Sequence, residues 1–260
     1  MERVVHMARI APLFTGMTDT LILSCLQGWM GDAWADDGAT PRCAQIVLGD
    51  FAFLAGDAEA PGALELAGHL PAGHEYLLAV PASEAWCARL EEANPGRQRR
   101  IVRYGLKKDP DVFDRERLTR FAGALPQGFR LSPIDERLYK IAMAGWNRDL
   151  CANFGSYADY RDRGLGVAAL READGMPVCG ASSYSRYEGG IEIEIGTDEA
   201  YRRRGLARAC AAQLILNCLD RGLYPSWDAA NLASLALAQQ LGYEPAGEYP
   251  TYWLAREAFA

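Results

Sequence analysis

The stretch IEIEIGTDEAYRRRGLA, residues 191–207, contains the pattern that decides the fold. Isoleucine and glutamate alternate from Ile191 to Ile195, which predicts a strand with one apolar face. After a short polar loop, Gly205 opens a segment that is almost wholly apolar or small as far as Leu219, which predicts a buried helix. A strand that leads through a short turn into a buried helix holds that turn rigidly.

The turn before this helix, Arg202–Ala207, has the properties of an anion site. The first backbone N–H groups of a helix have no partner within it and lie at the positive end of its dipole. Gly205 lets the backbone approach an anion closely, and Ala207 leaves room where a larger side chain would block a phosphate. Three arginines add positive charge. The alternative is an ordinary helix start beside a solvated basic turn.

The elements around this turn predict an α+β fold built in layers. Three strand-like runs precede the helix, and the turns Asp174-Gly175 and Gly189-Gly190 join them, which indicates an antiparallel meander. A strand, a helix and further strand material follow, as in an α+β layered domain. The predicted elements are helices 133–151 and 156–163, strands 166–172, 176–187 and 191–197, helix 205–220, strand 224–228, helix 232–241 and strand 243–254.

The first part of the chain is strand-rich and carries no recognisable catalytic set. We predict an N-terminal domain over residues 1–116 and a second domain over residues 128–256, separated by a polar, linker-like region. The first domain is expected to shape the acceptor cleft or to form an oligomer contact. Its predicted elements are strands 44–48, 51–55 and 76–80 and a helix 83–93 capped by Ser83. A linker at 107–111 and a helix at 115–125 follow them.

Composition excludes several classes of protein. The chain has 260 residues, 50% of them hydrophobic, and a net charge of −7, which argues against a nucleic-acid partner. No apolar run approaches the roughly 20 residues that span a bilayer, and the N-terminus lacks the features of a signal peptide. We therefore expect no membrane partner. The seven scattered cysteines show no metal-ligand spacing, so we expect buried free thiols in a cytoplasmic protein and no metal.

Two motifs in order resemble the GNAT superfamily of N-acetyltransferases. Arg202–Ala207 fits that family's Arg/Gln-x-x-Gly-x-Gly/Ala loop, and Asn231, Ser234 and Leu241-Gly242-Tyr243 match its second motif. The resemblance covers roughly residues 129–254 and is closest to a bacterial two-part branch. It implies an α+β fold with a mixed, mostly antiparallel sheet flanked by helices, joined to an N-terminal strand-rich α/β domain. It also implies acetyl transfer from acetyl-CoA, as co-substrate, to a primary amine that attacks directly in a ternary complex.

The resemblance also implies which residues hold the cofactor. The backbone of the arginine-rich turn would bind the pyrophosphate of coenzyme A, and the end of the preceding strand would splay from its neighbour to meet the pantetheine arm. The second motif would lie on the other side of the arm. The cofactor-binding residues are then Ile195, Gly196, Thr197, Arg202, Arg203, Arg204, Gly205, Leu206, Ala207, Asn231 and Ser234.

Glu192 and Glu194 are the candidates for the general base. They are two residues apart on one strand and therefore share a face, where burial and mutual repulsion would raise a pKa toward the range useful for a base. The alternative is a partly hydrated face or structural pairing with arginine. Many family members carry a general-acid tyrosine where this chain has Ala238. Tyr243 or water would then protonate the departing thiolate, or the thiolate would leave without an acid.

The acceptor is a small-molecule or peptide amine, and the acidic surface mildly favours a basic one. The aromatic candidates for the acceptor site could instead pack in the core. The candidate aspartate could instead cap the following helix. A homodimer is one possible assembly. The competing function is a non-catalytic acyl-CoA-binding sensor or regulatory module. The candidate acceptor-site residues are Trp146, Phe154, Trp227 and Asp228.

Overall fold

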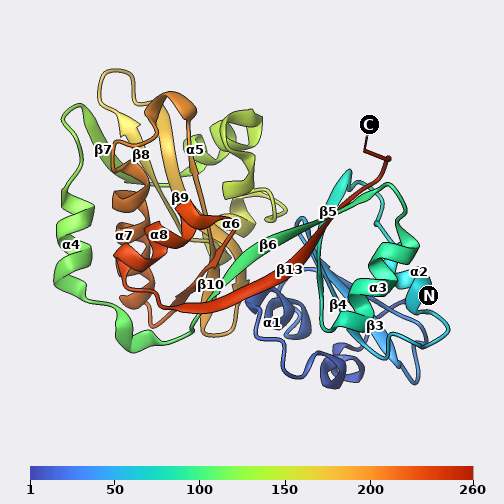
Figure 1. The fold of residues 1–260 in the computed structure, drawn as a ribbon. Coiled ribbons are helices and arrows are strands. Elements are labelled where there is room, and N and C mark those ends of the chain that lie inside the picture. The colour runs from blue at the N-terminus through green and yellow to red at the C-terminus, as the bar shows by residue number, and fades with distance from the viewer. Residues whose placement is uncertain (260) are drawn as a thin grey trace. The chain divides into compact units, whose positions relative to one another are not determined.

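The computed structural model describes residues 1–259, which form two compact units. The first unit contains Met1–Arg103 and the segment that starts at Glu248, and the second is Tyr104–Gly247. Figure 1 shows the chain coloured along its length. The functional domains expected at 1–116 and 128–256 stay predictions, because the two units are defined by contacts and not by function.

The first unit contains a sheet whose strands follow the order β1-β2-β3-β4-β5-β13. Ser83 caps α3 by accepting a hydrogen bond from the Trp86 N–H, as the sequence predicts. The bounds are β1 Glu2–Arg3, β2 Asp32–Ala35, β3 Cys43–Leu48, β4 Phe51–Gly56, β5 Tyr76–Pro81, β13 Pro245–Ala255, α1 Thr20–Leu26, α2 Ala63–Ala67 and α3 Glu84–Ala93. The predicted strands and helix of this part are confirmed.

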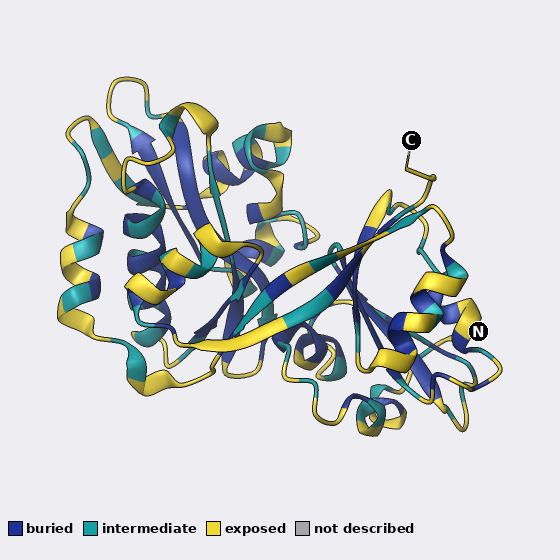
Figure 2. Cartoon of the chain, viewed as in Figure 1, coloured by how far each residue is buried: buried dark blue, intermediate teal, exposed yellow. Residues whose placement is uncertain are grey.

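The second unit contains a five-stranded sheet in the order β11-β10-β9-β8-β7. Strands β7 to β10 are antiparallel neighbours and β11 pairs parallel to β10, so the predicted meander and mixed sheet are confirmed. The bounds are β7 Phe129–Pro133, β8 Gly166–Arg171, β9 Pro177–Tyr187, β10 Gly190–Thr197 and β11 Tyr224–Ser226. Figure 2 shows that the middle strands of this sheet are largely buried.

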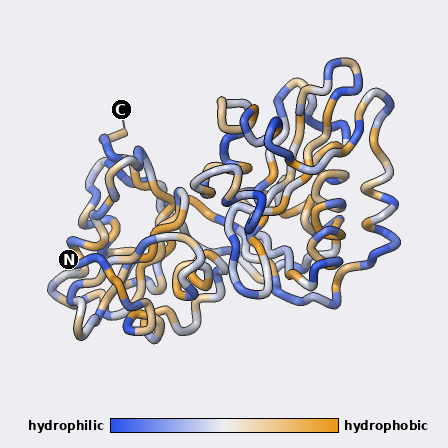
Figure 3. The backbone as a smooth tube through the Cα atoms, turned by 180° about the vertical axis from the view of Figure 1, so that it is seen from behind, coloured by the Kyte–Doolittle hydropathy of each residue, from blue (hydrophilic) through white to orange (hydrophobic). Residues whose placement is uncertain are grey.

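Helices cover this sheet. The long helix α7 (Leu206–Leu219) packs on β8, β9 and β10, and α4 (Arg115–Gly123) packs on the outside of α7. Eight residues of α7 are buried, which explains why it is apolar on nearly every side. The remaining elements are β6 Gln98–Leu106, α5 Glu136–Ile141, α6 Tyr157–Arg163, β12 Asp228–Ala229 and α8 Leu232–Leu241. In Figure 3 the turns are mostly hydrophilic and the segments inside each unit are hydrophobic.

The predicted helix over residues 133–151 is wrong in its extent. Residue 133 ends β7, and α5 begins after Asp135, whose carboxylate accepts from the Leu138 N–H. The helix then widens into a π-helical turn at Ala142–Trp146, where Gly145 has a φ of 121°. Because a residue with that φ cannot continue a right-handed helix, the chain leaves the helical path there.

The cysteines have the surroundings that the sequence predicts. All seven cysteines are free and buried, as predicted. Within residues 1–259, no group of His, Cys, Asp and Glu side chains is arranged to hold a metal ion, and no helix is long and apolar enough to cross a membrane.

Candidate functional site

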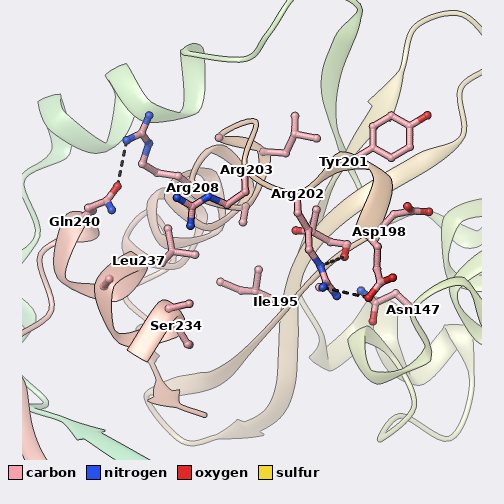
Figure 4. Close-up of a pocket in the computed structure, with 18 of the residues that line it drawn as sticks. Asn147, Ile195, Asp198, Tyr201, Arg202, Arg203, Arg208, Ser234, Leu237 and Gln240 are labelled. Carbon is pink, nitrogen blue, oxygen red and sulfur yellow. Dashed lines mark hydrogen bonds and ion pairs between the residues drawn. The ribbon is translucent and has the colours of Figure 1, made fainter. Parts of the chain in front are cut away.

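A cavity of about 1150 Å³ lies in the second unit, at the turn that the sequence singles out. Its walls come from the end of β10, the turn after it, the first residues of α7 and one side of α8. Trp146 and Asn147 from the segment after α5, and Trp227 after β11, complete the lining. Figure 4 shows these side chains around the cavity, with Arg208 and Gln240 at one end and Asn147 at the other.

The turn before α7 presents backbone N–H groups toward the cavity. Arg203 and Gly205 both have positive φ, at 63° and 80°, which turns the chain sharply into the helix. The first helical hydrogen bond runs from the Ala209 N–H to the Gly205 carbonyl, at 3.1 Å. No side chain within residues 1–259 caps α7, so the N–H groups of its first turn have no protein partner. A turn of this kind has the geometry that can bind an anion.

The three arginines of the turn differ in their surroundings. Arg202 and Arg203 line the cavity, and Arg202 pairs with Glu199 at 3.2 Å. Arg204 does not line it: its guanidinium lies 5.1 Å from the centre of the Tyr201 ring and donates to the Ala200 carbonyl. Two of the three arginines that the sequence suggests for the anion site therefore line the cavity.

Arg208 is a functional candidate that the sequence analysis misses. It lies in the first turn of α7, its Nη1 donates to Gln240 Oε1 at 3.1 Å, and its guanidinium lies 4.6 Å from the centre of the Phe121 ring. A basic residue at the third position of the helix was the available signal. The structure also adds lining residues that no motif indicated: Asn147, Asp198, Glu199, Tyr201, Ala233, Ala236, Leu237 and Gln240.

The end of β10 forms the second wall of the cavity. β10 pairs with β11 through Gly190, Ile191 and Glu192, whereas its pairing with β9 continues to Thr197. Within the described part of the chain, the strand pairing between β10 and β11 therefore ends at Glu192. The residues expected to meet the pantetheine arm, Ile195, Gly196 and Thr197, all line the cavity on this strand.

The second motif is divided between binding and capping. Ser234 lines the cavity, but Asn231 does not. Asn231 is the N-cap of α8, and its Oδ1 accepts from the Ser234 N–H at 3.0 Å. Its amide is thus engaged in starting the helix that carries the cavity wall.

The two glutamates lie outside the cavity lining. Glu192 is 7% exposed, and its cross-strand partners Ser185 and Ser226 are fully buried. Lys108 reaches this row, because its Nζ donates to Ser226 Oγ at 2.8 Å. Burial raises the pKa of neighbouring Tyr224 to about 12, and the negative charge of Glu192 adds to that rise. Glu192 thus meets the condition of burial on which its expected role depends.

The acceptor-site candidates separate into two groups. Trp146 and Trp227 line the cavity, whereas Phe154 and Asp228 do not. Phe154 is 3% exposed and packs edge-on against Tyr160, with ring centres 5.1 Å apart, so it belongs to the core. Asp228 lies in β12, where it pairs with Gly105.

The positions considered for a general acid are both buried. Ala238 is 0% exposed on the inner side of α8. The Tyr243 hydroxyl donates to the Pro225 carbonyl at 2.5 Å, and burial raises its pKa well above the usual value. Tyr243 does not line the cavity, so its proton is not directed toward a ligand there.

The chain matches a family model and several solved structures. A family model described as GNAT acetyltransferase matches residues 11–252. A solved structure described as a GCN5-related N-acetyltransferase-like protein, from Streptococcus suis 89/1591, is 43% identical, with a TM-score of 0.87 over 95% of this chain and 98% of that one. A GCN5-related N-acetyltransferase from Kribbella flavida, 19% identical, shares the fold with a TM-score of 0.57 over 84% of this chain and 88% of that one.

A curated relative matches a smaller share of the chain. The "Uncharacterized N-acetyltransferase YdfB" of Bacillus subtilis (strain 168) is 32% identical over 131 residues, which is 50% of this chain and 49% of that protein. The match therefore spans about half the length of that relative.

Proposed function

The chain belongs to the GNAT acetyltransferase family, whose members include N-acetyltransferases, and we propose that it transfers the acetyl group of acetyl-CoA to a primary amine. The amine attacks the thioester directly, in a ternary complex. The observation that carries this proposal is one cavity in which an uncapped helix start, at Gly205, adjoins the end of β10 beyond its pairing with β11.

These two features match the two halves of acetyl-CoA. The N–H groups at the start of α7, with Arg202, Arg203 and Arg208 nearby, suit the pyrophosphate. The backbone of residues 195–197, beyond the pairing of β10 with β11, would offer donors and acceptors to the amides of the pantetheine arm. Ser234 and Leu237 on α8 would flank that arm on its other side.

Glu192 or Glu194 would accept the proton that the amine loses as it attacks. The new C–N bond forms first, the C–S bond then breaks, and the electron pair of the C–S bond leaves with the thiolate of coenzyme A. A thiolate is a stable leaving group, which is consistent with Ala238 at the position of the family's tyrosine. Because neither glutamate lines the cavity, the proton would pass through water to reach buried Glu192 or half-buried Glu194.

In this proposal, residues 128–256 form the acetyltransferase domain and contain the site. Residues 1–116 would contribute to acceptor selection or to assembly. The acceptor itself is a small-molecule or peptide amine.

The test is thiol release from acetyl-CoA with a panel of primary amines, for the wild type, Glu192→Gln and Glu194→Gln. We expect loss of the base to lower turnover by about 10²- to 10⁴-fold in at least one variant. Calorimetry should give an unchanged acetyl-CoA affinity, because neither side chain lines the cavity.

The competing function, a non-catalytic acyl-CoA-binding sensor, predicts a different result. In that case acetyl-CoA binds to all three proteins, but no amine in the panel releases the thiol. Turnover that both substitutions leave unchanged would instead remove the two glutamates from the mechanism.

A further inference from the structure

Asn147 lies at the end of the cavity away from Arg208, against Gly196 of β10 (Figure 4). The contact is close: Asn147 Nδ2 lies 1.6 Å from the point that a Cβ on Gly196 would occupy. Gly196 is therefore a glycine because the amide of Asn147 fills the space where a side chain would start.

The amide of Asn147 is available to a ligand. Within residues 1–259 it makes no hydrogen bond, although its backbone carbonyl accepts from the Leu150 N–H at 3.3 Å. The cavity has one other side-chain amide, that of Gln240, which already accepts from Arg208. Asn147 thus presents a neutral donor that the fold does not use.

The backbone around Asn147 is held in place by a pair of glycines on the sheet. Gly180 and Gly196 are cross-strand partners on β9 and β10. A Cβ on Gly180 would meet Leu150 Cδ1 at 2.6 Å, just as a Cβ on Gly196 would meet the Asn147 amide. The segment 146–150 therefore lies directly on a smooth part of the sheet, and the π-helical turn before it directs the chain there.

We propose that the Asn147 Nδ2 group donates a hydrogen bond to the thioester carbonyl oxygen of acetyl-CoA. This inference rests on the proposed function, in which the pyrophosphate binds at Gly205 and the pantetheine arm follows β10 toward Gly196. When the amine attacks, the carbonyl π electrons move onto that oxygen, and the Asn147 N–H stabilises the negative charge. The charge returns to reform the C=O bond as the thiolate leaves.

Carbon-13 NMR of acetyl-CoA labelled at the acetyl carbonyl tests the contact without an acceptor amine. A donated hydrogen bond moves a carbonyl resonance downfield, so we expect a downfield shift on binding to the wild type. Asn147→Asp, which keeps the shape but has no N–H at neutral pH, and Asn147→Ala should each return the resonance toward its free position. Gln240→Ala removes the other amide and should leave the carbonyl shift in place.

The outcomes separate this inference from the function beneath it. A wild-type protein that binds no acetyl-CoA contradicts the proposed function. A bound resonance that is the same in the wild type, Asn147→Asp and Asn147→Ala contradicts the role of Asn147 alone.

A double-mutant cycle with Gly196→Ala gives a second readout once an acceptor amine is known. Removal of a side-chain donor to a developing oxyanion lowers kcat by about 10²- to 10³-fold, and we expect this of Asn147→Ala. Gly196→Ala should have a similar effect, because its Cβ displaces the amide, and the double variant should be no slower than either single one. Unchanged kcat in Asn147→Ala, or losses that simply add, would overturn the proposal.

Discussion

At the scale of single residues, Arg208 lines the cavity whereas Arg204 does not. Gln240 and the Phe121 ring fix Arg208 at the start of α7, whereas Arg204 stacks on Tyr201. Both belong to the same basic segment of the sequence. They differ in position because their side chains meet different partners.

Arg208→Gln should weaken acetyl-CoA binding by about tenfold or more, because a hydrogen bond to a charged group contributes roughly 1.5–3 kcal/mol. Arg204→Gln removes the same charge from the same segment but lies outside the cavity lining, and should change the affinity much less. Calorimetry at two salt concentrations checks both. Equal losses in the two variants would mean that general positive charge, and not the position of Arg208, attracts the ligand.

Sequence reasoning could predict the residues whose role depends on near neighbours. Ser83 is a helix cap because it accepts a bond from Trp86, three positions later, which a short motif reveals. Asn147 could not be predicted in this way, because its role depends on Gly196, on a different element. The same holds for Arg208 and its partner Gln240.

At the scale of elements, Asn231 starts α8 and so supports one wall of the cavity. Asn231→Ala should lower the free energy of unfolding by about 1 kcal/mol, whereas Asn231→Ser, which can still cap, should cost less. Thermal unfolding measures both variants, and acetyl-CoA titration follows. If Asn231 acts through the cap, affinity and stability recover together in the serine variant. Weak binding by a serine variant of wild-type stability would instead indicate direct contact with the ligand.

Helix α6 carries an ion pair with a defined pH dependence. Arg163 Nε lies 2.5 Å from Asp159 Oδ1, and this contact holds the pKa of Asp159 below its usual value. A lowered pKa in the folded state stabilises the fold above the unfolded pKa of about 3.9, and that contribution disappears as the pH falls through the folded value.

Arg163→Gln should therefore lower the Tm at pH 7, by an amount equivalent to about 0.5 kcal/mol. The Tm values of the variant and the wild type should converge as the pH falls below about 3.9. Scanning calorimetry across this range tests the pair. A difference in Tm that stays constant with pH would show that Arg163 stabilises α6 by packing on Phe154 instead.

The meander and the helices α7 and α8 could be predicted because their signals are local: alternation, glycine turns and apolar runs. The segment after α5 could not. Its residues have helical spacing, but the left-handed conformation of Gly145 and the flat surface of Gly180 and Gly196 take the chain out of the helix. Contacts with the sheet override the local preference there.

At the scale of the whole molecule, the chain returns to its first unit at the end. Glu248 begins the return, and Tyr252 and Leu254 on β13 join the buried core that contains Trp86. β13 pairs with β5, a strand far away in sequence. The strand itself could be predicted from its composition, but its partner could not, because long-range pairing leaves no signal in the spacing of residues.

The central claim is that acetyl-CoA binds with its pyrophosphate at the start of α7. Calorimetric titration of acetyl-CoA into the wild type, Gly205→Glu and Gly222→Glu tests it most directly. Gly205 and Gly222 lie just beyond opposite ends of α7 and have similar φ values, 80° and 66°, so the two substitutions impose comparable backbone strain. We predict binding by the wild type and by Gly222→Glu, and none by Gly205→Glu. Equal binding by all three proteins, or no binding by the wild type, would contradict the claim.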